Sequence, residues 1–408
     1  MEKRKSFAKS HHKATIKRLI YENGPLSRTD IHKKIGIRPA SITQLTKELI
    51  QEKILIEKGL GNNRKGKKQR LLTLNPQGGM VIGVEFDPHS IHGLLIDLEN
   101  KIINEEEYSI LEGTAGNQIV DLLKKTINQL INWNSEQLPQ LLGIGIADPG
   151  MVDREQGISL FCSQINDWRN VPLRELMEKE FHLPVYIEGN TNCKLLAESL
   201  FGAGRNFQNQ IYIDLSYGIG ASLMTHGSFY YGAQGLAGEL GHVQYDKSGP
   251  ICSCGNHGCL EMFVSSSAVM RSIKNAVLHG VISPFLDQIR ENSEFLSIQS
   301  FIQAANENDK FCISLVEEMG RTLGEVIANL VNFLNPEAIL IGGELADLGV
   351  LILNPVKGTV RRQSLELATR NLSFKIAEIK DRPAARGAAS LVLNQLFKGN
   401  EFFDLSFS

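Results

Sequence analysis

The chain has 408 residues, 42% of them hydrophobic, which excludes a disordered polypeptide and is ample for more than one domain. The net charge of −2 hides an imbalance: residues 1–75 carry 19 Lys and Arg against 6 Asp and Glu, and the remainder carries 24 against 39. A basic head on an acidic body favours a nucleic-acid partner for the head over a generic solvated tail. With no signal peptide and no membrane-spanning apolar run, we expect a cytoplasmic protein without a membrane partner.

Three short helices are predicted in the head. The first has apolar residues at helical spacing and stops at Asn23-Gly24-Pro25. Ser27 is the expected N-cap of the second, which Gly36 breaks, and the third starts at Pro39. Three helices with a tight glycine turn before the last predict a helix-turn-helix.

The third helix separates an apolar stripe from an outward polar face. Ile42, Leu45, Leu49 and Ile50 form the stripe. Short polar side chains on the outer face can reach base edges in a major groove, while cations favour phosphates. The predicted DNA contacts of this region are Ser41, Thr43 and Gln44, with Lys47 and Arg38 on phosphates.

Two strands, at residues 54–57 and 70–74, follow the helices and are joined by a glycine-rich basic loop. Five cations fall within seven residues of this loop and its end. Such a loop can follow phosphates or enter a narrow minor groove, although a solvated linker is the alternative for any one residue. We therefore predict a winged helix-turn-helix domain over residues 1–75, with wing contacts from Arg64, Lys65, Lys67, Lys68 and Arg70.

The body repeats one strand pattern. Apolar runs at residues 80–86, 91–97 and 101–103 recur in kind at 211–215, 220–224 and 228–231. Each run is followed by alternating helices and strands, which predicts a duplicated α/β architecture. We expect a first lobe over residues 79–200 and a second over 201–408, with a ligand site in the cleft between them. Asp148, in a turn at the cleft edge, could touch ligand or only shape the turn.

A four-ligand zinc site is predicted in the second lobe. His242, Cys252, Cys254 and Cys259 lie within eighteen residues, punctuated by glycines. Zinc takes imidazole nitrogen and thiolate sulfur tetrahedrally, and four protein ligands leave no open position, so the metal would be structural. Ordinary buried cysteines and a disulfide are the alternatives, and the clustering of three of the six cysteines within eight residues disfavours the first.

Two carboxylates flank this stretch. Glu239 precedes His242 by three residues, and Glu261 follows Cys259 by two. Folding the loop around zinc would bring both acids and one imidazole face together. Each carboxylate can accept from adjacent hydroxyls, so the group is suited to a polyhydroxylated ligand, although two solvated surface acids are the simpler interpretation.

These motifs resemble the ROK family of bacterial sugar repressors and sugar kinases. The resemblance rests on Glu239-Leu-Gly-His242, on Cys252-x-Cys254-Gly-x-x-Gly-Cys259-Leu-Glu261 and on Asn335-Pro-Glu-Ala-Ile-Leu-Ile-Gly342-Gly343. It implies two ribonuclease-H-like lobes of the actin and hexokinase type and a C-terminal helix that packs back on the first lobe. It also implies a structural Zn²⁺ on the histidine and cysteines, and sugar contacts from Glu239, His242 and Glu261.

The chain departs from the kinases of that family at two points. Their Asp-x-Gly-Gly-Thr phosphate turn corresponds here to Glu85-Phe86-Asp87-Pro88-His89, in which side chains replace glycines and Pro88 has no amide hydrogen. Their catalytic aspartate corresponds to Asn190, preceded by Gly189. A carboxamide cannot accept a proton but can bind a hydroxyl, so Asn190 is predicted as a sugar contact and no residue as catalytic.

The sequence thus predicts a transcriptional repressor of carbohydrate-utilisation genes with a catalytically inactive sensor body. Its expected partners are palindromic operator DNA, a carbohydrate effector and a second copy of itself, as a homodimer or a dimer of dimers. The resemblance offers xylose, glucose, N-acetylglucosamine and their phosphates as candidate effectors. The alternatives are an ATP-dependent sugar kinase with a fused DNA-binding head, and a regulator that senses a protein instead of a sugar.

Overall fold

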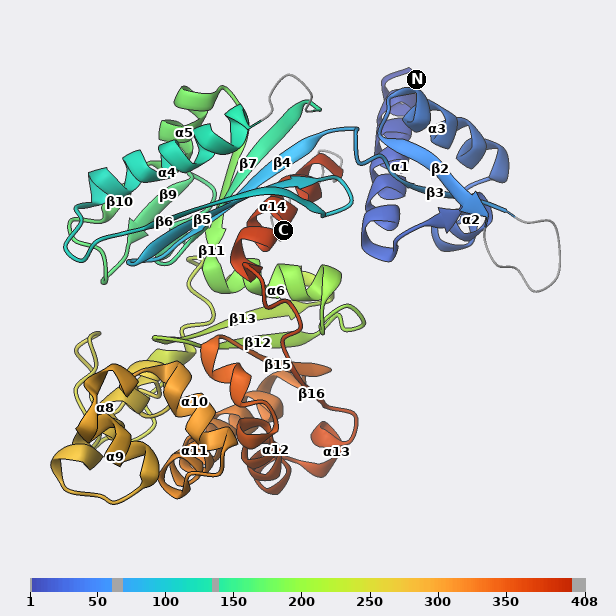
Figure 1. The fold of residues 1–408 in the computed structure, drawn as a ribbon. Helices are drawn as coiled ribbons and strands as arrows, with labels where there is room; N and C mark the ends of the chain where they lie inside the picture. The colour runs from blue at the N-terminus through green and yellow to red at the C-terminus, as the bar shows by residue number, and fades with distance from the viewer. Residues whose placement is uncertain (1, 61–68, 134–138, 398–408) are drawn as a thin grey trace. The chain divides into compact units, whose positions relative to one another are not determined.

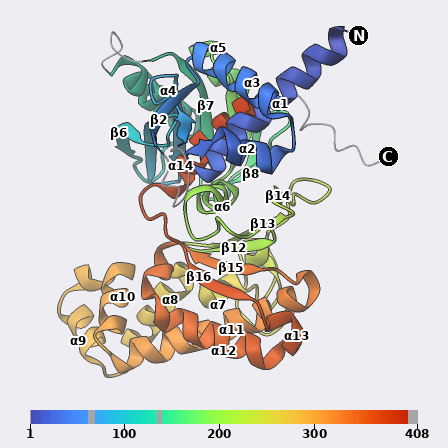
Figure 2. The same ribbon diagram turned by 90° about the vertical axis from the view of Figure 1, so that its right-hand side faces the viewer.

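The computed structural model describes residues 2–60, 69–133 and 139–397 (Figures 1 and 2). The chain divides into two compact units. The first contains the residues up to Leu196 and those from Arg382, and the second runs from Ala197 to Asp381. The division falls inside helix α6 (Asn190–Phe201). Among the described residues, no helix combines the length and apolar character needed to cross a membrane.

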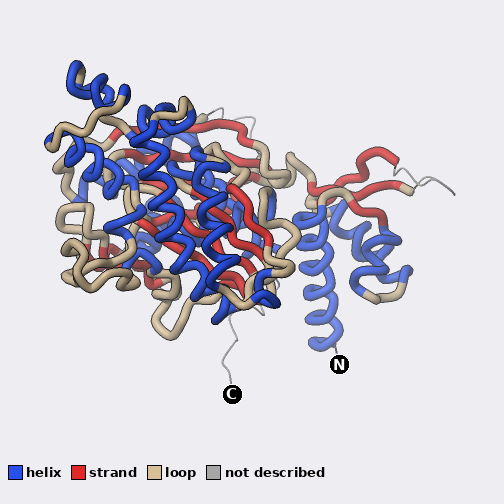
Figure 3. Tube along the Cα trace, turned by 90° about the horizontal axis from the view of Figure 1, so that it is seen from below, coloured by secondary structure: helices blue, strands red, loops and turns tan. Residues whose placement is uncertain are grey.

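The N-terminal head of the first unit (residues 2–74) combines three helices with a small antiparallel sheet. The strand order is β1-β3-β2, and the last two strands form a hairpin, drawn in red beside the blue helices in Figure 3. The elements are α1 (Glu2–Asn23), β1 (Leu26–Ser27), α2 (Arg28–Ile35), α3 (Pro39–Gln51), β2 (Leu55–Leu60) and β3 (Arg70–Leu74). The predicted helices and strands of this region are thus present, and β1 is an addition.

Local sequence explains how α2 begins and ends. The Ser27 side chain accepts a hydrogen bond from the Asp30 backbone amide, and the Asp30 carboxylate accepts one from the Ser27 backbone amide, which is a capping box. Gly36 ends the helix with φ +78°, a left-handed conformation that favours glycine. The turn into α3 therefore follows from these residues, and Ile31 and Ile42 are fully buried beneath it.

The first lobe is built on a five-stranded sheet in the order β11-β7-β4-β5-β6. The first three strands along the chain form an antiparallel meander, and the other two run parallel to β4. The strands are β4 (Met80–Phe86), β5 (Ser90–Asp97), β6 (Ile102–Ser109), β7 (Leu141–Asp148) and β11 (Val185–Gly189). A side sheet holds β8 (Met151–Asp153), β9 (Ile158–Phe161) and β10 (Arg169–Val171).

Helices cover both faces of this sheet. On one face, α4 (Gly116–Asn132) and α5 (Leu173–Phe181) enclose a core that includes the buried Trp168. On the other lies α14 (Pro383–Phe397), beside β4 and β7 in Figure 1. The helix approaches so closely that a Cβ at Gly145 would lie 1.9 Å from the Ala388 carbonyl oxygen. Glycine at this strand position is therefore required by the packing of α14.

The second unit repeats the same strand order. Its sheet runs β14-β13-β12-β15-β16, again an antiparallel meander followed by two parallel strands. The strands are β12 (Gln210–Leu215), β13 (Ile219–Thr225), β14 (Ser228–Phe229), β15 (Ala338–Gly342) and β16 (Ser373–Ile376). Two sheets that share one order confirm the duplication predicted from the repeated strand pattern.

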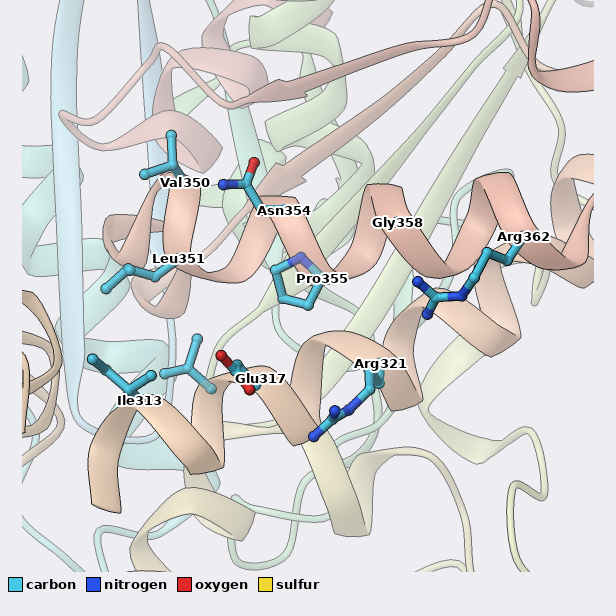
Figure 4. A pocket seen from close by; sticks show the side chains of 10 residues that line it. Ile313, Glu317, Arg321, Val350, Leu351, Asn354, Pro355, Gly358 and Arg362 are labelled. Carbon is cyan, nitrogen blue, oxygen red and sulfur yellow. The ribbon is translucent and has the colours of Figure 1, made fainter. Parts of the chain in front are cut away.

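The helices of the second unit enclose its core. They are α7 (Glu261–Val264), α8 (Ser266–Leu278), α9 (Pro284–Glu291), α10 (Ile298–Asn306), α11 (Lys310–Leu334), α12 (Val350–Gln363) and α13 (Glu366–Thr369), with short 3₁₀ turns η1 (Leu240–His242), η2 (Ser293–Phe295) and η3 (Glu344–Leu348). A Cβ at Gly320 would lie 2.4 Å from Pro355, so α12 packs directly on α11. An open groove of about 410 Å³ remains beside the two helices. Figure 4 shows the side chains of α11 and α12 that line it.

Candidate functional site

The predicted metal ligands come together in the second unit. The ligand atoms of His242, Cys252, Cys254 and Cys259 all lie within 4.8 Å of one another. The Cys254 and Cys259 sulfurs are 3.6 Å apart, well beyond a disulfide bond of about 2.05 Å, and both cysteines are free. A set of three thiols and one imidazole at these separations fits a tetrahedral zinc ion.

The loop that carries the ligands is held by its own backbone. The amide of Cys252 donates to the Asn256 carbonyl at 2.8 Å, and Gly255 donates back to Cys252 at 2.9 Å. A Cβ at Gly258 would lie 1.5 Å from the Asp246 carbonyl oxygen, so glycine is required there. Tyr245 packs on Phe263 at 5.2 Å and donates to Glu325 of α11, which ties the loop to the core.

The two predicted carboxylates lie beside this loop. His242 directs Nδ1 toward the Cys252 sulfur, 3.6 Å away, and Nε2 toward the Glu239 carboxylate, 3.9 Å away. Glu261 accepts from the Ile219 amide at 3.1 Å, above the Gly218 turn. Partial burial raises the pKa of Glu239, the His242 imidazole opposes this shift, and Glu261 adds to it. The three predicted sugar contacts of this unit therefore lie close enough for His242 and Glu261 to affect the pKa of Glu239.

The fourth predicted sugar contact, Asn190, belongs to the first unit, where it begins α6. Its Nδ2 donates to the Phe86 carbonyl at 3.3 Å. Its Oδ1 is buried and has no hydrogen-bond partner among the described residues. A buried amide oxygen without a donor is suited to accept from a hydroxyl that the protein itself does not supply.

Backbone amides of the segment predicted to correspond to the kinase phosphate turn are bound by a side chain of the same segment. Asp87 accepts from the amides of His89, at 2.6 Å, and Ser90, at 2.7 Å. Those amides are thus already occupied by a side chain of the turn. Glu85 accepts from the Ala385 amide of α14 at 2.8 Å, and burial raises its pKa.

Asp148 proves to be a buried group. Its side chain has no exposed surface, Oδ1 accepts from the Gly150 amide at 2.7 Å, and Oδ2 has no partner among the described residues. Burial raises the pKa of this carboxyl to about 6, although the Ser159 side chain and the Gly150 amide oppose the shift. The sequence left open whether Asp148 touches ligand or shapes the turn, and the Gly150 bond establishes at least the second role.

In the head, the predicted base contacts share one exposed face of α3. Ser41, Thr43, Gln44 and Lys47 are exposed, while Ile42 and Leu49 have no exposed surface. Arg38 is exposed at the start of the helix. Arg70 is also exposed, but its guanidinium pairs with Glu57 at 2.5 Å. The predicted wing cations Arg64, Lys65, Lys67 and Lys68 lie outside the described residues.

The fold and the sites define a class of protein: a basic helical head joined to a two-lobed α/β body of the actin and hexokinase type. The model of the ROK family matches residues 81–395. The chain belongs to that family.

Three known proteins share much of its length. A xylose repressor from Caldicellulosiruptor bescii is 32% identical over 394 residues, which cover 97% of this chain and 98% of the relative. A solved ROK family transcriptional regulator, a homologue of the Escherichia coli MLC protein, matches with a TM-score of 0.82 at 29% identity and covers 96% and 98% of the two chains. A ROK family glucokinase from Streptomyces griseus, solved with glucose and AMPPNP, matches with a TM-score of 0.67 at 27% identity over 77% of this chain and 99% of its own.

Proposed function

We propose that the chain is a sequence-specific DNA-binding repressor of carbohydrate-utilisation genes, and that its kinase-like body senses a sugar or sugar phosphate. The observation that carries this proposal is the exposed face of α3, where Ser41, Thr43, Gln44 and Lys47 project from a basic head. Small polar side chains backed by cations suit a recognition helix in a major groove. The head is then a winged helix-turn-helix. A relative named as a xylose repressor and a solved ROK family transcriptional regulator both match the chain along nearly its whole length.

Sugar contacts are proposed at Glu239, His242 and Glu261 of the second unit, and Asn190 of the first unit is proposed as a further sugar contact. Two carboxylates supply acceptors for adjacent hydroxyls, and the Nε2 side of His242 supplies a further polar contact. Zn²⁺ bound by His242, Cys252, Cys254 and Cys259 would tie the loop and thereby fix the imidazole, without taking part in chemistry. The metal is proposed as structural.

No phosphoryl transfer is expected in this body. At the kinase base position, the Asn190 carboxamide cannot accept a proton. At the phosphate turn, Asp87 occupies the nearby amides and Pro88 offers none. The kinase alternative is kept because a glucokinase shares the fold and 27% of the aligned residues. Sugar-dependent release of ADP from ATP would establish it.

The repressor is proposed to act as a homodimer, or a dimer of dimers, on a palindromic operator. Two heads related by a two-fold axis would contact half-sites about one helical turn, 34–36 Å, apart. The effector can change the affinity for DNA only by the ratio of its own affinities for the two arrangements of the chain.

The decisive experiment measures binding to the DNA beside the protein's own gene, at fixed salt, with xylose, glucose, N-acetylglucosamine and their phosphates added in turn. One of these should shift the affinity for DNA. Glu239→Gln and Glu261→Gln should each weaken that response without changing DNA binding in the absence of sugar. Glu318→Gln, an exposed acid on α11, is the matched control. A chain that fails to bind DNA, or whose response survives both substitutions, would contradict the proposal.

A further inference from the structure

The last helix of the chain, α14, is anchored at its N-terminus by the central strand of the first lobe. Glu85 at the end of β4 accepts from the Ala385 amide at 2.8 Å. The first amides of a helix lack partners within the helix and lie at the positive end of its dipole, so a carboxylate there satisfies a donor and stabilises the charge. Glu85 thus acts as a cap supplied from 300 residues away in sequence.

Arg382, the residue before α14, fixes the same end to two further strands. In the sheet register, Glu85 faces His92 of β5, and His92 faces Glu107 of β6, so the three side chains share one face of the sheet. Arg382 donates to Glu107 at 2.8 Å, and its other terminal nitrogen lies 3.3 Å from His92 Nε2. The N-terminus of α14 is therefore held by β4, β5 and β6 together.

At its other end, α14 meets the DNA-binding head. The ring of Phe397 packs edge-on against Tyr21 of α1 with centroids 5.4 Å apart, and both side chains are buried. Lys17 of α1 donates to the Leu396 carbonyl at 2.8 Å, and its ammonium lies 5.6 Å from the centre of the Phe397 ring. The end of α14 thus has an apolar contact and a charged hydrogen bond with a single helix of the head.

Between these ends the helix has no room to slide. A Cβ at Gly83 would lie 2.0 Å from the Ala385 carbonyl oxygen, and one at Gly387 would lie 1.9 Å from the Cys193 carbonyl oxygen of α6. Helices α6 and α14 are also the segments at which the chain passes between its two units, after Leu196 and before Arg382. A fifteen-residue helix, about 22 Å long, thus runs from this crossing to the head.

We propose that α14 is a rigid strut that sets the orientation of the DNA-binding head, and that Lys17, Tyr21 and Phe397 are the positioning residues through which the effector response reaches it. The effector part of this proposal rests on the proposed function. A rearrangement that displaces Glu85 or Arg382 also displaces α14, because close backbone contacts fix this helix along its length. The displacement of α14 then changes the position of α1.

The strut is tested first without DNA or sugar, by hydrogen–deuterium exchange of the full chain. Phe397→Ala should speed exchange of the α1 amides roughly tenfold, and Lys17→Met should do so by a smaller factor. Glu85→Gln, at the far end of α14, should also speed α1 exchange, by roughly threefold. Glu105→Gln, an exposed acid on β6, is the control and should change nothing in α1.

Two results would refute the strut. One is exchange of the α1 amides at the wild-type rate in both Phe397→Ala and Lys17→Met. The other is exchange of the α1 amides at the wild-type rate in Glu85→Gln. Exchange of the β12 and β13 amides should remain unchanged in these variants. If Phe397→Ala also speeds exchange in those strands, the result for Lys17→Met decides whether the strut is correct.

A second measurement compares DNA affinity with and without the sugar panel. In Phe397→Ala the ratio of the two affinities should approach one while sugar affinity is retained, and a ratio equal to that of the wild type would refute the coupling. If no sugar affects the wild type, the proposed effector function fails, and the exchange experiment still decides the strut.

Discussion

Replacement of Asp148 by asparagine should stabilise the protein at neutral pH. The carboxyl is fully buried, with a pKa of about 6 against 3.8 for an ordinary aspartate. Ionising it in the folded chain therefore costs about 3 kcal/mol more than ionising it in the unfolded chain. Asparagine keeps an acceptor for the Gly150 amide and removes the charge. The free energy of unfolding should rise by about 1–3 kcal/mol. The new NH₂ group takes the place of Oδ2, which also lacks a hydrogen-bond partner, so the substitution leaves no additional polar atom unpaired.

The pH dependence follows from the direction of the shift. Since the pKa of Asp148 is raised by folding, its ionisation destabilises the protein above pH 6, and this cost fades as the pH falls toward 3.8. The cost of about 3 kcal/mol near pH 7.5 becomes about half as large near pH 5. The stability advantage of Asp148→Asn should shrink accordingly.

The assay is urea unfolding at about pH 7.5 and about pH 5, in which the free energy of unfolding is taken from the transition that includes the first unit. Asp153→Asn is the control, since Asp153 also closes a turn of this lobe, by accepting from the Gln156 amide, and is partly exposed. A stability difference between wild type and Asp148→Asn that is the same at both pH values, or a variant less stable at neutral pH, would refute the reasoning.

Three further predictions follow from the sites and the packing. Cys254→Ala should lower the zinc content measured by mass spectrometry well below one ion per chain, whereas Cys162→Ala, at a buried cysteine outside the cluster, should leave it unchanged. In DNA-binding titrations at several salt concentrations, Lys47→Ala should weaken binding about equally for all DNA sequences and reduce the salt dependence by about one phosphate contact. Gln44→Ala should instead relax specificity at one base pair. Equal effects of both substitutions on every sequence would contradict the assigned roles. Gly145→Ala should destabilise the protein by about 1–3 kcal/mol in thermal unfolding, because the added Cβ meets the Ala388 carbonyl; an unchanged melting temperature would contradict the close approach of α14.

Features encoded by neighbouring residues could be predicted from the sequence. The cluster of candidate metal ligands could be predicted because its four residues fall within eighteen residues. The second helix of the head could be predicted because Ser27 and Gly36 define its ends. The duplication of the body was also predictable, because each meander repeats a local alternation of apolar runs and turns.

Features that depend on distant contacts could not be predicted. The sequence indicates a lost phosphate turn at Glu85, but not that its carboxylate caps a helix 300 residues later. The burial of Asp148 could not be predicted either, because it involves the side chain of Ser159 on β9, a different strand from β7, which Asp148 ends. Strand β1, with two residues, has no period to recognise and exists through its pairing with β3.

The residues that are predicted to prevent phosphate binding also supply structural contacts. A phosphate turn needs free backbone amides, whereas here Asp87 occupies two of them and stiffens the turn after β4. The neighbouring Glu85 caps α14. Because α14 ends on α1 of the head, this helix connects the end of β4, where Asn190 donates to the Phe86 carbonyl, with the head. The end of β4 thus carries both the turn closed by Asp87 and the cap of α14, which is why Glu85→Gln is the most informative variant of the body.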